Sequence, residues 1–399
     1  MTDTRDRLLP TEVLFEGAFP RLSRRLRFGI VGGGRIAVIQ AMGARLSDRW
    51  EMVAGALSSD PVTAKARGAD WFLPDERCFA TYEEMATIEA ERPDGIDAVV
   101  ITTPNDGHYG AARAFLEAGI DVLCDKPLTN DLSEAIELLH LARKTGLVFC
   151  VAHAFTSFPM VRQAREMVQG GVIGQVNQIH TEYMQDWMTT DATAAAPHVK
   201  WRLDPAKTGL TSCTGDIGTH AFNLANFVTG LTLDSLAADL TAFVPGRRVD
   251  DNGHVLMRYQ GGAKGMLWCS QVAPGNENGL RLRVYGTKGG LEWAQEDPNH
   301  LWFTPFGQPK RLITRGGAGS GPEAARVTRV PPGHPEGYLE GFANIYTEAA
   351  RAIRAAKTGT PVPDGTTYPG LKAGLEGVAF VDACVRSSAR DGAWVSLNL

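Results

Sequence analysis

Residues 26–37 read Leu26-Arg27-Phe28-Gly29-Ile30-Val31-Gly32-Gly33-Gly34-Arg35-Ile36-Ala37. The first six form a short apolar run, which is typical of a central strand that is buried on both faces. Gly32 allows a tight turn, and the missing Cβ of Gly34 lets a pyrophosphate approach the backbone. A helix beginning near Ile36 would offer unpaired N–H groups to that phosphate. The pattern predicts a dinucleotide site at this turn, which also contains Arg35; the alternative is a glycine-rich turn without a ligand.

Strands and helices alternate from residue 26 to about residue 155. Short apolar runs predict strands at 26–31, 51–58, 96–102, 121–124 and 147–152. Periodic segments between them predict helices at 36–46, 61–68, 108–118 and 133–145. Because alternating strands and helices build parallel sheets, residues 26–155 are expected to form a doubly wound Rossmann domain. Residues 1–25 are polar and irregular, and are expected to be an extension before it.

The pattern changes after residue 155, and residues 156–399 are expected to form a second α/β domain. Glycine-rich turns separate runs at 176–185, 236–244, 253–259, 265–271, 280–285, 290–293 and 301–304. Such runs predict the strands of an antiparallel or mixed sheet. Helices are expected at 159–170, 338–355 and 370–387, and a glycine- and proline-rich loop at 316–335.

The composition excludes several classes of protein. The 399 residues suffice for two or three domains of about 150 residues each. A formal net charge of −5 gives no basic surface for nucleic acid. No run of 18 apolar residues predicts a membrane span, and the charged N-terminus is unlike a secretory signal. Six widely spaced cysteines without a C-x-x-C pair predict no metal site and a reducing, cytoplasmic location.

The second predicted strand ends at Ser58, and Ser59 and Asp60 follow it. In a Rossmann domain an acid at this position binds the adenosine ribose and would repel the 2′-phosphate of NADP, whereas serine hydroxyls accommodate that phosphate. Lys65 and Arg67 are near enough in sequence to assist. The choice between NAD and NADP therefore stays open. The other interpretation, which does not exclude the first, is that Ser59-Asp60-Pro61 caps the next helix.

Two further segments follow strands at the edge of the sheet where Rossmann cofactors lie. The first is Thr103-Pro104-Asn105 with His108 after it, and Asn105 is expected either to hydrogen-bond the nicotinamide half or to cap a helix. The second contains Lys126, just before Pro127. A lysine there can donate to an alcohol oxygen and stabilise a developing alkoxide. An isolated lysine is more often a surface residue.

Asp216 and His220 lie at the start of a predicted helix that runs to Val228, in the segment Thr214-Gly215-Asp216-Ile217-Gly218-Thr219-His220. The i, i+4 spacing places both side chains on one face. A histidine beside a carboxylate is a typical general base or acid. The alternative assigns Asp216 to the N-cap of the helix and His220 to the buried core.

Together these segments resemble the Gfo/Idh/MocA family, which includes glucose–fructose oxidoreductase and inositol dehydrogenase. The resemblance rests on Gly-Ile-Val-Gly-Gly-Gly-Arg-Ile-Ala, Thr-Pro-Asn-x-x-His, the Lys-Pro turn and Gly-Asp-Ile-Gly-x-His, in that order. It implies a Rossmann domain and a C-terminal α/β domain whose open, mostly antiparallel sheet builds homodimers or homotetramers. It also implies tightly held NAD or NADP.

The resemblance further implies roles for single residues. Lys126, Asp216 and His220 match the catalytic constellation of the family and would also touch the substrate. Asp125 stands where the family usually has Glu, as a contact to the cofactor ribose. The cofactor contacts implied by the matched segments are Gly32, Gly34, Arg35, Ile36, Thr103, Pro104, Asn105, His108, Asp125 and Lys126, to which the end of the second strand adds Ser58 and Ser59.

A narrower resemblance joins two segments, Tyr183-Met184-Gln185-Asp186-Trp187 and Trp201-Arg202, to the sugar-binding segments of levoglucosan dehydrogenases. In those enzymes a Gln, a Trp and an Arg surround the sugar; core packing is the alternative for Trp187 and Trp201. Phe155 stands where those enzymes have Tyr. The implied substrate contacts are Gln185, Trp187, Arg202, His153 and, from the segment His334-Pro335-Glu336-Gly337-Tyr338, His334.

We therefore expect an NAD(P)-dependent dehydrogenase that moves a hydride between nicotinamide and a secondary alcohol of a sugar, glycoside or inositol. In this hypothesis Lys126 and His220 handle the hydroxyl proton, and Asp216 fixes the substrate and the imidazole. The expected partner is a small-molecule substrate. The alternative, from another class, is a non-catalytic sensor of a sugar or dinucleotide on the same fold; the presence of all three catalytic residue types argues against it.

Overall fold

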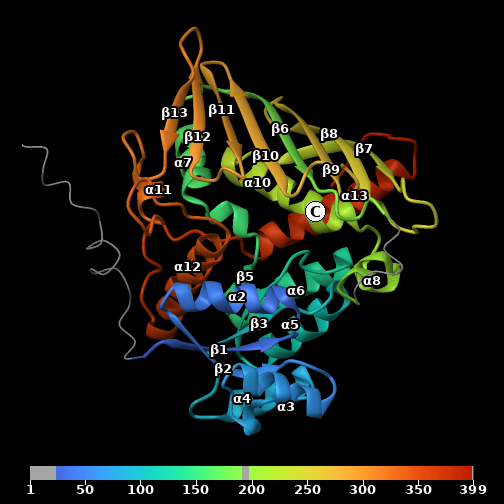
Figure 1. The fold of residues 1–399 in the computed structure, drawn as a ribbon, viewed down its shortest axis with the longest axis vertical. Helices are drawn as coiled ribbons and strands as arrows, with labels where there is room; N and C mark the ends of the chain where they lie inside the picture. Colours follow the sequence, from blue (N-terminus) through green and yellow to red (C-terminus); the bar gives the residue numbers. More distant parts are fainter. Residues whose placement is uncertain (1–23, 191–196, 398) are drawn as a thin grey trace, which may run out of the picture.

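The computed structural model of the protein describes residues 24–190, 197–397 and 399. It contains two sheets, which Figure 1 shows one above the other with helices between them. The expected N-terminal extension lies outside the described residues up to residue 23. Among the helices of the described residues, none combines the length and apolar composition that a membrane crossing requires.

The first sheet has five parallel strands in the order β2-β1-β3-β4-β5. Their bounds are β1 Leu26–Val31, β2 Trp50–Ala56, β3 Ala98–Ile101, β4 Asp121–Cys124 and β5 Phe149–Val151. The order reverses between β1 and β3, and the carboxyl ends of two such strands form the crevice in which doubly wound sheets bind ligands. The sequence prediction of a Rossmann-type parallel sheet is confirmed.

Five helices accompany these strands: α2 Arg35–Leu46, α3 Pro61–Asp70, α4 Tyr82–Glu91, α5 His108–Glu117 and α6 Leu132–Thr145. All but α4 were predicted from the sequence. The apolar pattern of α4 is weak because it buries a charged residue, Glu89, which accepts a hydrogen bond from Arg77 (Nε to Oε1, 3.0 Å). In a sequence, the two charged residues of a buried ion pair look like surface residues. The apolar periodicity therefore did not predict α4.

The second sheet has nine strands in the order β13-β12-β11-β10-β6-β9-β8-β7-β14. Every neighbouring pair is antiparallel except β6 and β9, so the predicted mostly antiparallel sheet is confirmed. The bounds are β6 Val176–Met184, β7 Leu233–Thr241, β8 Asn252–Tyr259, β9 Lys264–Ser270, β10 Gly279–Gly286, β11 Gly289–Ala294, β12 His300–Pro305, β13 Arg311–Thr314 and β14 Val395–Ser396.

Two predictions for this sheet need correction. β7 begins and ends three residues before the predicted run at 236–244, since its register with β8 starts at Leu233. The edge strands β13 and β14 were not predicted. Edge strands are short and need only one partner, and β14 pairs with β7 at just Val395 and Ser396. Such short segments carry too few residues for a period-2 pattern.

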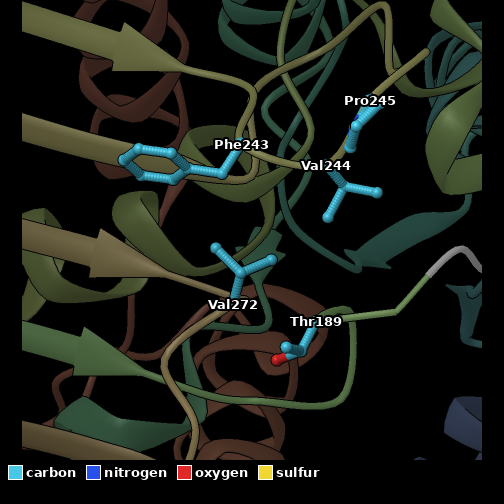
Figure 2. Close-up of a pocket in the computed structure, with 5 residues that line it drawn as sticks. All are labelled: Thr189, Phe243, Val244, Pro245 and Val272. Carbon is cyan, nitrogen blue, oxygen red and sulfur yellow. The ribbon is translucent and has the colours of Figure 1, made fainter.

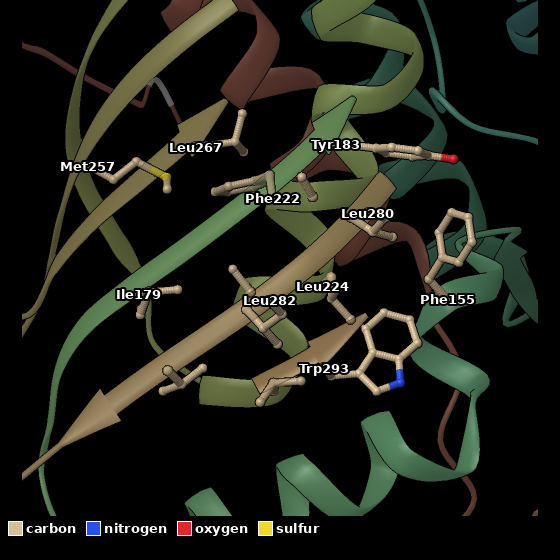
Figure 3. Packing of buried hydrophobic residues seen from close by; sticks show 14 of the residues in the cluster. Phe155, Ile179, Tyr183, Phe222, Leu224, Met257, Leu267, Leu280, Leu282 and Trp293 are labelled. Carbon is tan, nitrogen blue, oxygen red and sulfur yellow. The ribbon is translucent and has the colours of Figure 1, made fainter. Parts of the chain in front are cut away.

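Helices α7 Pro159–Gln169, α10 Thr219–Thr229 and α13 Leu371–Ser388 cover one face of the second sheet. Figure 3 shows Phe222 and Leu224 of α10 packed against Leu280 and Leu282 of β10 and Ile179 of β6. On the opposite face the side chains of β8 and β9 alternate with the buried ones and reach the surface. The short helices α8 Pro197–Lys200, α9 Pro205–Thr208 and α11 Pro322–Ala325 lie in connections.

Helix α12, Tyr338–Thr358, comes from the far end of the chain but packs on the first sheet beside α2. Trp50 Nε1 donates to the carbonyl oxygen of Tyr346 (2.8 Å), and the Tyr346 hydroxyl donates to Gln40 Oε1 (2.9 Å). Phe28 packs against both aromatic rings. The domain boundary after residue 155 stays a prediction. Helix α12, from beyond that boundary, shares one core with the first sheet.

Asp121 is a buried carboxyl group at the start of β4, where its Oδ1 accepts a hydrogen bond from the backbone N–H of Val148 (2.8 Å). Burial raises the pKa of Asp121 to about 6, although the hydrogen bond from Val148 and the charge of Lys357 oppose this shift. Because this pKa lies above the value of about 3.9 in an unfolded chain, the folded state binds the proton more tightly.

We predict that Asp121→Asn stabilises the protein at pH 8 by about 1–3 kcal/mol and changes stability little near pH 4, since a pKa unit corresponds to about 1.4 kcal/mol. The stability that the neutral carboxyl contributes is complete below about pH 4 and is lost as the pH rises through about 6. Urea unfolding at several pH values measures this. Asp364→Asn, in an exposed loop, is the control. An equal effect of Asp121→Asn at both pH values would contradict the prediction.

Candidate active site

The glycine-rich turn after β1 packs directly against the end of β3. Gly32 has a φ of +103°, and an added Cβ would lie 2.8 Å from the carbonyl group of Thr102. Both features require glycine. At Gly34 an added Cβ would meet nothing within 4 Å, and no side chain caps the N-terminus of α2. The open backbone N–H groups therefore face free space at the reversal point of the sheet. Arg35 is exposed here, and Ile36 packs partly into the core beneath α2.

Asp60, after β2, is engaged in capping. Its Oδ2 accepts hydrogen bonds from the backbone N–H (2.8 Å) and hydroxyl (2.6 Å) of Thr63, which confirms the predicted N-cap of α3. Ser58 Oγ accepts from the backbone N–H of Asp60 (3.2 Å), and Ser59 is exposed. Arg67 Nη1 donates to the carbonyl oxygen of Leu57 (2.7 Å), beside the glycine-rich turn. Lys65 instead pairs with Asp75.

Two residues predicted to contact the cofactor brace the loops of this edge. His108 is buried, with Nδ1 2.7 Å from the carbonyl oxygen of Pro127 and Nε2 3.1 Å from that of Thr103. It thereby ties the loop after β3 to the loop after β4. Asn105 Nδ2 donates to the carbonyl oxygen of Thr208 (3.2 Å), which ties the first loop to α9. Pro104, just before Asn105, is exposed.

Lys126 follows β4 and is only 12% exposed, so the alternative of a surface lysine is wrong. Its Nζ donates to Asp216 Oδ1 (2.6 Å) and to the backbone carbonyl oxygen of the same residue (2.7 Å). The backbone N–H of Lys126 donates to Asp125 Oδ1 (2.9 Å), and the Lys126–Pro127 peptide bond is cis. Burial raises the pKa of Asp125, and the nearby Lys126 ammonium opposes this shift.

The segment Thr214–Gly218 forms a π-helical turn that leads into α10. Asp250 anchors its start: Oδ1 accepts from the backbone N–H of Ser212 (2.6 Å), and Oδ2 accepts from the backbone N–H (2.8 Å) and hydroxyl (2.6 Å) of Thr214. Asp216 therefore does not serve as the N-cap, and its carboxylate turns toward Lys126. Single π-helical turns of this kind occur mainly at functional sites.

Asp216 stays ionised although it is partly buried. Burial raises its pKa, but the charges of Lys126 and Arg202 outweigh this and hold the pKa well below the usual range. The two carboxylate oxygens have separate partners. Oδ1 accepts from Lys126, while Oδ2 accepts from Gln271 Nε2 (2.9 Å) and lies 3.6 Å from Arg202 Nε.

His220 pairs with His153, which sequence analysis assigned to the substrate. The two Nδ1 atoms are 3.5 Å apart, and Phe155 packs against the His220 ring at 4.9 Å between centroids. Burial, with the Lys126 charge, lowers the pKa of His153 to about 3 and that of His220 well below its usual value. Both imidazoles are therefore neutral at ordinary pH, and a hydrogen bond between the two Nδ1 atoms requires that one of them carries the proton.

The predicted sugar-binding segments form a hydrogen-bonded group beside Asp216. Trp187 Nε1 donates to Gln185 Oε1 (2.6 Å), and Gln185 Nε2 donates to Asn278 Oδ1 (2.9 Å). The Arg202 guanidinium lies 4.4 Å from the Trp201 ring and 5.9 Å from the Trp187 ring. Trp187 is 40% exposed, so core packing is wrong for this side chain.

Some residues of this region were not found from the sequence. Gln271 is the last residue of the predicted strand 265–271, and Asn278 lies in the connection that follows. Their positions in the sequence do not show that Gln271 contacts Asp216 or that Asn278 contacts Gln185. The side chain of His334 is exposed, and Tyr338, in the same predicted segment, is 38% exposed while its ring packs against Phe155 (6.1 Å between centroids). Burial and the nearby carboxylates of Asp125 and Asp216 raise the pKa of the Tyr338 hydroxyl.

A hollow of about 500 Å³ lies next to this group, where loops meet at the ends of the second sheet (Figure 2). Its lining is mainly apolar and consists of Thr189, Phe243, Val244, Pro245 and Val272. None of these side chains supplies a titratable group.

Two family models match most of the chain. Residues 26–153 match the oxidoreductase family with an NAD-binding Rossmann fold, named GFO/IDH/MocA, and residues 161–292 match the GFO/IDH/MocA C-terminal domain.

Comparisons with individual proteins indicate the same family. The crystal structure of an oxidoreductase from Sinorhizobium meliloti is 54% identical, with a TM-score of 0.86, and covers 94% of this chain and 100% of that chain. An inositol dehydrogenase homolog from Azotobacter vinelandii, complexed with NADH and myo-inositol, is 34% identical over 96% of this chain and 100% of that chain (TM-score 0.89). Levoglucosan dehydrogenase of Pseudarthrobacter phenanthrenivorans is 25% identical over 94% of this chain and 98% of its own length. The chain belongs to the GFO/IDH/MocA family of oxidoreductases with an NAD-binding Rossmann fold.

Proposed function

We propose that the protein is an NAD-dependent dehydrogenase that moves a hydride between nicotinamide and a secondary alcohol of a sugar, glycoside or inositol. The observation that carries this proposal is the meeting of an ammonium, an ionised carboxylate and a neutral imidazole beside the carboxyl ends of β3 and β4. Lys126, Asp216 and His220 are the three residues. The inositol dehydrogenase homolog and levoglucosan dehydrogenase support an alcohol of this class.

The turn after β1 fits a dinucleotide. Gly34 leaves open space where a side chain would project, and the uncapped N-terminus of α2 offers N–H groups and partial positive charge to a diphosphate. When bound, the nicotinamide accepts or donates the hydride. Ser58 and Ser59 put no carboxylate directly after β2, and Asp60 is engaged as an N-cap, so NADP should be measured beside NAD.

The three residues divide the proton chemistry among them. Lys126 Nζ uses two of its three N–H donors on Asp216, which leaves the third for the oxygen of the reacting alcohol. That donor would stabilise the negative charge that develops on the oxygen during oxidation. His220 is neutral and can take up the hydroxyl proton through Nε2 in the tautomer whose Nδ1–H donates to His153. Asp216 keeps the ammonium in place.

The group around Trp187 suits a polyhydroxylated ring. Trp187 offers an exposed aromatic face, and the amides of Gln185 and Asn278 offer hydrogen bonds next to it. Aromatic surface combined with a few fixed polar groups is typical of small-molecule sites. Arg202 closes the side toward Asp216. We therefore propose Gln185, Trp187 and Arg202 as substrate contacts.

We also propose a homo-oligomer that forms through the open face of the second sheet. Leu256 of β8 and Met266 of β9 are paired across the strands and are 53% and 43% exposed. Trp302 and Leu312 form a similar exposed pair on β12 and β13. Apolar side chains gathered on one face favour association with another copy.

All six cysteines are free, which supports the cytoplasm as the location.

We predict that Lys126→Ala lowers kcat by about 10²–10⁴-fold, because the alkoxide loses its cationic donor while cofactor binding is retained. Absorbance at 340 nm, with NAD and NADP and a panel of monosaccharides, inositols and glycosides, measures turnover; NADH fluorescence measures binding. Undiminished turnover in the variant would refute the role of Lys126. Tight NADH binding by the wild type without turnover of any compound would favour a non-catalytic sensor.

A second prediction concerns Gly34. Aspartate is a favourable N-cap, so Gly34→Asp should maintain or raise the melting temperature. Its carboxylate would project into the open space and repel the diphosphate, and the Kd for NADH should rise at least about tenfold. Gly377→Ala, in α13, adds an uncharged methyl group at another position where a Cβ would meet nothing within 4 Å, and it should leave the Kd unchanged. Unaltered NADH affinity in Gly34→Asp would show that the diphosphate binds elsewhere.

A third prediction tests the oligomer. Met266→Glu should yield a smaller assembly than the wild type in sedimentation velocity, since a charge in the centre of an apolar contact must be desolvated. Val62→Glu, on the exposed surface of α3, is the matched control and should sediment like the wild type. A monomeric wild type, or an unchanged size of Met266→Glu, would refute the proposed interface.

A further inference from the structure

Gln271 lies immediately after β9 and is completely buried. Its backbone is held on both sides: its N–H donates to the carbonyl oxygen of Asp251 (2.9 Å), and its carbonyl oxygen accepts from the N–H of Met188 (3.0 Å). The side chain therefore projects from a fixed point on the second sheet toward the loop that carries Gln185 and toward the π-helical turn that carries Asp216.

The orientation of the Gln271 amide follows from its neighbours. Nε2 lies 2.9 Å from Asp216 Oδ2 and 3.5 Å from Gln185 Oε1. The carboxylate oxygen can only accept, and Gln185 Oε1 already accepts from Trp187. The NH₂ group must therefore face both oxygens. Gln271 is thus the bridge between the ionised carboxylate and the substrate-binding segment.

The amide has a structural disadvantage. Its other end, Oε1, is buried and has no hydrogen-bond partner in the part of the chain that the structure describes. A buried carbonyl oxygen without a donor destabilises a fold, and an apolar side chain of the same size would remove this penalty. The contribution of Gln271 to folding stability therefore does not explain a glutamine at this position, whereas its contact with Asp216 does.

We propose that Gln271 is a positioning residue of the dehydrogenase, an inference that rests on the function proposed above. By binding Oδ2 it fixes the plane of the Asp216 carboxylate, so that Oδ1 stays on Lys126 Nζ. Through Gln185 it also couples that carboxylate to Trp187, where the sugar ring is proposed to bind.

Other charged or titratable groups also surround Asp216. Lys126 and Arg202 are the cations that face it, and His220 and Asp125 lie close enough to affect or sense its charge. Arg202 approaches the same oxygen as Gln271 but only to 3.6 Å, so the short contact to Oδ2 belongs to the glutamine.

The test compares Gln271→Met, Gln271→Glu and Gln40→Met with the wild type. Gln40 is the matched control, because it is also buried, has one hydrogen-bonded amide atom and has one amide atom without a partner in the described structure. We expect Gln271→Met to lower kcat about 10–100-fold, since small misplacement of a catalytic group has effects of this size. NADH affinity should stay within about twofold, and the melting temperature should be unchanged or higher.

Gln271→Glu should move the acidic limb of the kcat–pH profile upward by about one unit or more, because two adjacent carboxylates cannot both ionise easily. A merely structural role would not shift this limb. Gln40→Met should keep the wild-type kcat and pH profile. Unchanged kcat in Gln271→Met together with an unchanged profile in Gln271→Glu would overturn the inference.

Failure of the proposed function is a separate outcome. If the wild type turns over no compound of the panel, crystal structures of the wild type and Gln271→Met still test the inference. We expect the Asp216 carboxylate of the variant to rotate and its contact with Lys126 to lengthen. An unmoved Lys126–Asp216 pair in the variant would overturn the positioning role, whatever the reaction of the protein is.

Discussion

The ion pair between Lys126 and Asp216 joins the two sheets at the place where the acid–base groups gather. Lys126 follows β4 of the first sheet, and Asp216 belongs to the π-helical turn under the second. Charges taken out of water destabilise a protein unless partners and hydrogen bonds compensate them. Here the ammonium has two oxygen acceptors on Asp216, and the carboxylate has a donor on each oxygen. Both segments must therefore be held in place by the structure around them.

Several features supply that rigidity. Asp250 fixes the start of the π-helical turn with three hydrogen bonds, and His108 ties the loop of Lys126 to the loop after β3. On a larger scale, α12 returns from the end of the chain to pack beside α2, through Trp50 and Tyr346. Each of these contacts links segments that are far apart in sequence, so the site forms only when the whole chain has folded.

The electrostatic result is a cluster in which the carboxylate is ionised and both imidazoles are neutral. Asp216 stays ionised because two cations face it, whereas burial, with the positive charge of Lys126, keeps His153 and His220 neutral. A neutral imidazole can accept a proton, and an ammonium next to it can stabilise an alkoxide, so the two groups favour the same direction of charge movement. Asp216 holds this arrangement together, and Gln271 orients Asp216.

The sequence by itself determined the local elements and the chemical types at the site. Each signal lies within a few residues: the run before Gly32, the turn at Gly34, the segment around Lys126 and the pair Asp216–His220. Strand, turn and helix could therefore be predicted at these places.

Tertiary structure alone decided which of these groups touch. The bridge from Gln271 to Asp216 spans 55 residues, and its geometry depends on the register of β9 in the second sheet. The pairing of His153 with His220, the bracing by His108 and the burial of Glu89 in α4 likewise depend on contacts between distant segments. Periodicity reports which face of one element is buried, but not which residue of another element lies against it.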